Sequence, residues 1–66
     1  MNGDLEYINQ EIEIYNNRIK RQKEKIKYIR DVIKDEPLYE VHVLKRLYAK
    51  RYSLQYKKDK LLNMMK

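Results

Sequence analysis

The sequence predicts an all-α protein: an antiparallel, coiled-coil-like hairpin of two long amphipathic helices. Apolar residues recur every three or four positions through most of the chain, which is the helical period. Glycine and proline occur once each, as Gly3 and Pro37, so few residues are present that could form strand-connecting turns. Pro37 lies near the middle of the 66 residues, where it can separate two helices of similar length.

The first helix is expected over about residues 4–34. Its apolar seam advances by alternating steps of three and four residues, with one polar interruption. The seam residues are Leu5, Ile8, Ile12, Tyr15, Ile19, Gln22, Ile26, Ile29 and Ile33. So regular a pattern indicates a packed helix face, and it argues against disorder as the meaning of the 39% charged residues.

The second helix is expected over about residues 37–65, after a turn at residues 35–36. A proline disfavours the α conformation in the preceding residue, so Glu36 is predicted to be the N-cap and Pro37 the first helical residue. The matching seam comprises Leu44, Leu47, Arg51, Leu54, Lys58, Leu61 and Met65. A connection this short favours an antiparallel hairpin, and one long helix kinked at Pro37 is the alternative.

The two seams also predict which residues face one another. If Ile19 lies opposite Leu54, the polar seam residues Gln22 and Arg51 meet as well. A polar layer of this kind would fix the register of the two helices, at some cost in stability. The competing interpretation is that Arg51 only extends from the edge of the seam into solvent.

A chain of 66 residues forms a single domain with a small core, and we expect that domain to span residues 1–66. No cysteine is present to reinforce it, so association of copies is the expected remedy. A second apolar stripe lies off each seam and is the candidate dimer seam: Tyr7, Ile14 and Tyr28 in the first helix, and Val41, Tyr48 and Leu62 in the second. We therefore expect a homodimer packed as a four-helix bundle, with docking onto a different protein as the alternative.

Charge is distributed unevenly along the chain, which carries a formal net charge of +6. Residues 1–17 carry −4, residues 18–34 carry +6, residues 35–44 carry −3 and residues 45–66 carry +7. The hairpin brings the two basic segments side by side. It therefore predicts a basic belt around the middle of the rod, which includes Arg18, Arg21, Lys25 and Lys50.

The side chains required for catalysis are largely missing. His42 and Ser53 are the one histidine and the one serine, and they lie about three turns apart on the second helix, too far to act as a base and a nucleophile. Glu40 and His42 lack the Glu-x-x-His spacing of metal sites in helical bundles, and a single glycine cannot form a phosphate-binding loop. We expect no enzymatic activity, no cofactor, no metal and no small-molecule substrate.

The second helix carries a basic, tyrosine-rich stretch. Its outward residues form a candidate partner-binding surface, here called the tyrosine strip: Lys45, Arg46, Ala49, Tyr52, Tyr56 and Lys60. Tyrosine and arginine are enriched at binding hot spots, and the basic belt would attract an acidic protein partner. The pattern therefore favours a protein-binding or regulatory module. The alternatives are a nucleic-acid-binding protein that uses the same face, and a purely structural coiled-coil element.

The expected location is the cytoplasm of the source or host cell, and no membrane partner is expected. No apolar stretch is long enough to span a bilayer, and the acidic first residues do not resemble a signal peptide. The abundance of Lys, Ile, Asn and Tyr is typical of low-GC bacteria and their viruses. One form of the binding hypothesis is therefore a small phage-type effector that binds and redirects a host protein.

Overall fold

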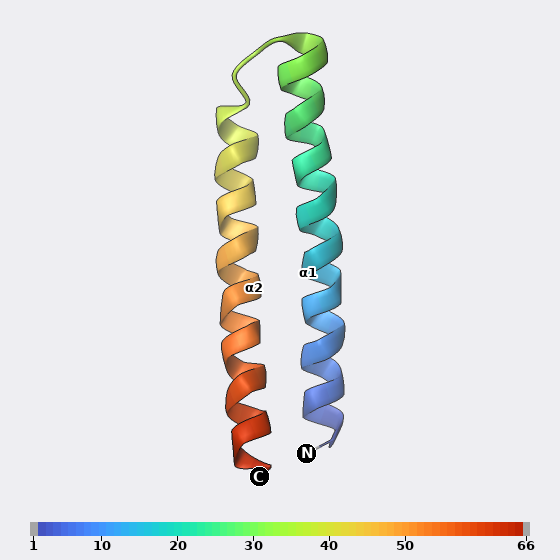
Figure 1. The fold of residues 1–66 in the computed structure, drawn as a ribbon, viewed down its shortest axis with the longest axis vertical. Helices are drawn as coiled ribbons and strands as arrows, with labels where there is room; N and C mark the ends of the chain where they lie inside the picture. The colour runs from blue at the N-terminus through green and yellow to red at the C-terminus, as the bar shows by residue number, and fades with distance from the viewer. Residues whose placement is uncertain (1, 66) are drawn as a thin grey trace.

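The computed structural model describes residues 2–65 and shows a helical hairpin (Figure 1). Helix α1 spans Asn2–Tyr28 and helix α2 spans Leu38–Met64, and the two run antiparallel along a rod of 50 × 14 × 13 Å. A π-helical turn, η1 (Ile29–Ile33), extends α1 before the chain reverses. The predicted hairpin is confirmed, and the alternative of one long helix kinked at Pro37 is wrong.

The chain leaves η1 through a residue in the left-handed conformation. Lys34 has φ 60° and ψ 41°, and its backbone N–H donates to the carbonyl of Ile29. The N–H of Asp35 reaches the same carbonyl at 3.3 Å. These two bonds satisfy a carbonyl at the helix end, as the left-handed C-terminal motifs do in other helices, although a glycine usually occupies this position.

Pro37 is the N-cap of α2, so the prediction that Glu36 caps this helix is wrong. Pro37 has φ −82° and ψ 62°, and the Leu38 N–H donates to the Glu36 carbonyl at 2.9 Å. This is an inverse γ-turn centred on proline, a conformation outside the helical region. The helix therefore begins one residue later than predicted, at Leu38, and the Asp35 Oδ1 accepts a bond from the Glu36 N–H at 2.8 Å.

The register of the two helices differs from the predicted one. Arg51 Nη1 donates to Asn16 Oδ1 at 3.0 Å, and Asn16 precedes the predicted partner Gln22 by six residues. Gln22 Nε2 donates instead to the backbone carbonyl of Glu40 at 2.9 Å. The predicted Gln22–Arg51 layer is therefore not formed. Residues 34–37 run back beside α1, so α2 begins below the tip of the first helical arm and its side chains meet earlier residues of α1 (Figure 1).

The predicted seams form the contact between the helices, but the core is thin. Among the described residues, the buried ones are Ile19, Ile26 and Pro37, and each buried isoleucine contributes about 1.5–3 kcal/mol. Ile33 and Met65, both predicted in the seam, are exposed, because Ile33 lies in the overhanging η1 and Met65 follows the last turn of α2. The other seam residues are half-buried: Leu5, Ile8, Ile12, Tyr15, Gln22, Ile29, Leu44, Leu47, Arg51, Leu54, Lys58 and Leu61.

Lys34→Gly is expected to stabilise the hairpin by about 0.5–1 kcal/mol, because glycine adopts positive φ without the steric cost that lysine carries. The matched control is Lys27→Gly, which removes the same charge from an exposed position inside α1 and should destabilise by about 1 kcal/mol. Thermal unfolding followed by far-ultraviolet circular dichroism measures both. Equal destabilisation by the two substitutions would contradict the left-handed conformation of Lys34.

Candidate functional site: two grooves and a basic tyrosine face

Two open grooves run between α1 and α2, on opposite sides of the hairpin. Groove A is lined by Ile12, Asn16, Tyr48, Ala49, Arg51, Tyr52 and Gln55. Groove B is lined by Asp4, Tyr7, Ile8, Leu54, Lys57, Lys60 and Leu61. Tyr7 and Asn16 are nine residues apart on α1, as are Tyr48 and Lys57 on α2. Nine residues make about two and a half turns, so the members of each pair lie on opposite sides of their helix.

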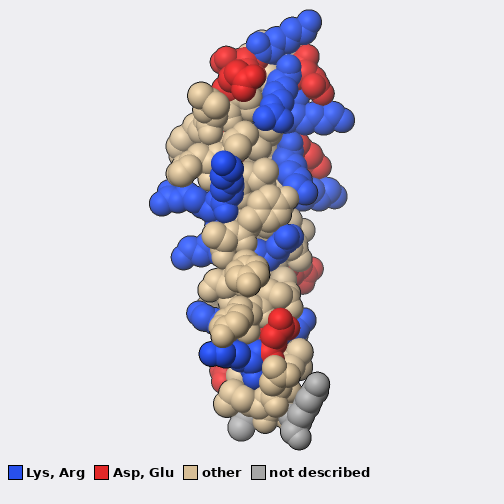
Figure 2. Space-filling view, turned by 60° about the vertical axis from the view of Figure 1, so that its left-hand side comes forward, with Lys and Arg blue, Asp and Glu red and all other residues tan. Residues whose placement is uncertain are grey.

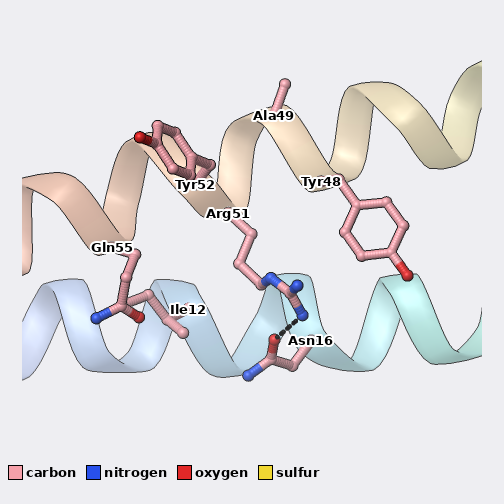
Figure 3. Close-up of a pocket in the computed structure, with 7 residues that line it drawn as sticks. All are labelled: Ile12, Asn16, Tyr48, Ala49, Arg51, Tyr52 and Gln55. Carbon is pink, nitrogen blue, oxygen red and sulfur yellow. Dashed lines mark hydrogen bonds between the residues drawn. The ribbon is translucent and has the colours of Figure 1, made fainter.

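Groove A is organised around Tyr48, whose ring points from α2 toward α1 (Figure 3). The Lys23 ammonium lies 5.5 Å from the ring centroid, and the Arg51 guanidinium carbon lies 5.0 Å from it. Both distances allow attraction between the cation and the ring face. Arg51 also bonds to Asn16, so the same side chain joins the ring to the opposite helix. Tyr48 therefore belongs to the contact between the two helices.

Sequence reasoning missed two α1 residues that contact α2: Asn16, which lines groove A, and Lys23, which lies beside the Tyr48 ring. Both flank the seam, since Asn16 follows Ile12 by four residues and Lys23 precedes Ile26 by three. That spacing is a signal that could have identified them as neighbours of the packed face. Their partners on α2 depend on the register of the two helices. The seam pattern predicted another register, in which Arg51 meets Gln22 and not Asn16.

All six residues of the tyrosine strip are exposed. Tyr52 and Tyr56 expose 75% and 55% of their surfaces, and the Ala49 and Tyr52 side chains point away from α1 (Figure 3). The Lys60 ammonium lies 5.0 Å from the centroid of the Tyr56 ring. Figure 2 shows uncharged surface running down this side of the rod with Lys and Arg side chains beside it. The strip thus combines accessible aromatic surface with positive charge.

The residues of the basic belt are also exposed: Arg18, Arg21, Lys25 and Lys50. The Arg18 guanidinium carbon lies 5.3 Å from the centroid of the Tyr15 ring, and Arg21 lines a shallow depression of α1 together with Lys20. On the face that Figure 2 shows, Lys and Arg side chains gather from the middle of the rod toward its turn end. Positive charge therefore extends further toward the turn than a belt at the middle of the rod.

The candidate dimer seam does not form one continuous surface. Tyr7 lines groove B, whereas Tyr48 lines groove A on the other side of the hairpin. Tyr48 and Val41 are half-buried, while Tyr7, Ile14, Tyr28 and Leu62 are exposed. The prediction treated the stripes of the two helices as one surface. Whether they lie on the same side depends on how each helix is rotated about its own axis, and the packed hairpin alone defines that rotation.

Residues 2–65 contain no cluster of His, Cys, Asp or Glu placed to hold a metal ion. His42 and Ser53 are both exposed on α2. In the part of the chain that the structure describes, neither helix combines the length and the apolar character needed to cross a membrane.

Comparisons with protein-family models, with curated proteins and with solved structures find no match to this chain. The features of the hairpin that bear on function are its exposed tyrosines, its cations and its two grooves.

Tyr48→Ala is expected to lower the free energy of unfolding by about 2 kcal/mol, since it removes a half-buried ring and its contacts with Lys23 and Arg51. Tyr52→Ala is the matched control, from the same helix but from an exposed site, and should change stability by less than about 0.5 kcal/mol. Urea unfolding compares the two. A larger loss for Tyr52→Ala would mean that its ring, rather than that of Tyr48, packs between the helices.

Proposed function

We propose that the chain is a small self-associating protein-binding module, which captures an acidic protein partner through the tyrosine strip of α2. The observation that carries the proposal is the exposure of Tyr52 and Tyr56 beside basic side chains on a helix with no buried residue of its own. Large aromatic side chains that a fold leaves in solvent are characteristic anchors of protein interfaces. The net charge of +6 favours a partner surface of opposite sign.

Self-association is supported by the thin core. Two isoleucines and one proline are the buried residues among those described, while several large apolar side chains remain exposed on both helices. Small domains without disulfides or metals often gain the missing burial from a second copy. A pair of hairpins would cover apolar surface that one hairpin leaves in water, and the phage-type effector remains one biological form of such a module.

Binding to nucleic acid through the same face is the second candidate, and the abundance of exposed Lys and Arg favours it (Figure 2). Of the two tyrosines of the strip, Tyr56 already has the Lys60 ammonium over its ring, whereas Tyr52 is 75% exposed and could stack on a base. The nuclease-treated capture and the DNA titration below therefore distinguish the two candidates.

Tyr52→Ala combined with Tyr56→Ala is expected to abolish partner capture, because both exposed anchors of the strip are lost. The immobilised chain is exposed to a nuclease-treated lysate of the source organism, and retained proteins are compared between variants. Tyr39→Ala is the matched control, since Tyr39 is 73% exposed on the same helix but lies on a different side of it from Tyr52. Retention of the same protein by the double variant would contradict the proposal.

Binding of a fluorescent 20-base-pair DNA duplex tests the second candidate. If the basic face holds phosphates, affinity should fall about 10³-fold or more between 50 and 200 mM salt, as expected for about six neutralised phosphates. Weak or absent binding at the lower salt concentration would exclude duplex DNA as the ligand. The protein-binding proposal predicts that outcome, together with a protein that is still captured after nuclease treatment.

A further inference from the structure

Helix α1 carries an exposed stripe that begins at groove B, which Tyr7 lines. Tyr7, Ile14 and Tyr28 expose 62%, 43% and 56% of their surfaces. They recur at multiples of seven residues, and Arg21 occupies the intervening position. A seven-residue repeat keeps one side of a long helix facing a partner over its whole length. This α1 stripe (Tyr7, Ile14, Arg21 and Tyr28) is not covered by α2, which packs against the seam.

The charge of α1 changes sign along the helix, from acidic at its start to basic at its end. Within α1, residues 2–17 carry −4 through Asp4, Glu6, Glu11 and Glu13, whereas residues 18–28 carry +5. Two copies of α1 placed side by side in parallel would set acid against acid and base against base. Two antiparallel copies would set the acidic half of each helix against the basic half of the other, twice over.

We propose that α1 packs antiparallel against α1 of a second copy along the α1 stripe, and that this contact is the self-association surface. The inference rests on the self-association put forward above and specifies its geometry. The occupant is a second copy because the charge pattern of α1 is complementary to itself in the antiparallel direction. A two-fold axis across the middle of the helix generates that arrangement and uses the same patch on both copies.

The heptad spacing fixes the layers of this contact. Tyr7 of one copy lies opposite Tyr28 of the other, and Ile14 lies opposite Arg21. Between these layers, Glu11 lies opposite Lys25 of the second copy, once on each side of the axis. Arg18 is the charged residue nearest the axis, and its guanidinium is held over the Tyr15 ring of its own chain, on the side of the seam.

In this arrangement α1 contacts the second copy and α2 remains available to a partner. The α1 stripe takes up the second copy, and α2 lies at the outside of the pair. Groove A, with Tyr48 and Tyr52 along it, lies on the side opposite groove B and stays open. Both copies therefore retain a tyrosine strip, which gives the pair two equivalent surfaces for a partner.

Charge exchange at Glu11 and Lys25 tests the geometry. Glu11→Lys or Lys25→Glu alone is expected to raise the dimer dissociation constant roughly tenfold at low salt, because each creates two like-charged pairs across the axis. The combined variant is expected to return to within about threefold of the unmodified chain. An equimolar mixture of the two single variants should also associate as the unmodified chain does. Sedimentation equilibrium gives the dissociation constant of each single variant, of the combined variant and of the mixture.

The positions are fourteen residues apart on one helix, about 21 Å, so recovery in the combined variant must arise between copies. Glu13→Lys is the control: it makes the same charge change at an exposed residue on another side of α1, and it should leave the dissociation constant unchanged. This contact is overturned if the single variants leave the dissociation constant unchanged, or if the combined variant does not restore it. Either result would mean that the copies associate through another surface. A monomer at every accessible concentration overturns both this contact and the self-association.

Discussion

The path of residues 34–37 determines which side chains of the two helices meet. Lys34 adopts the left-handed conformation and Pro37 centres an inverse γ-turn, and together they direct the chain back beside α1 before α2 begins. Helix α2 is consequently displaced along α1 from the predicted register, since Arg51 bonds to Asn16 and Gln22 bonds to the backbone of Glu40.

One consequence is the pairing of cations with tyrosine rings. With this register Tyr48 lies close enough to α1 for Lys23 to reach its ring, while Arg51 joins the same ring to Asn16. Charged residues make up 39% of the chain, and some of them, such as Lys23 and Arg51, cover part of an aromatic ring. These contacts supplement a core whose buried isoleucines are Ile19 and Ile26.

A second consequence is that the two sides of the hairpin differ. The groove A side holds the Tyr48 ring with its two cations, and Ala49 and Tyr52 of the tyrosine strip lie along it, whereas Lys60 of the strip lines groove B. Groove B meets the α1 stripe at Tyr7, and the stripe continues along α1, where its apolar residues are exposed and the helix changes from acidic to basic. A thin core between two unlike faces is consistent with a module that associates through one face and recruits a partner through the other.

The sequence by itself determined the helices, the hairpin and the identity of most seam residues, because a 3.6-residue period and a single central proline allow few alternatives. It also determined that the tyrosine strip lies outward, since removal of the seam leaves those positions no packing partner. The tertiary structure alone decided the register, the cap at Pro37 and the separation of Tyr7 from Tyr48 onto opposite sides. Those features depend on backbone angles at four linker residues, and the three- and four-residue spacing of the seams allows apolar residues to meet in more than one register.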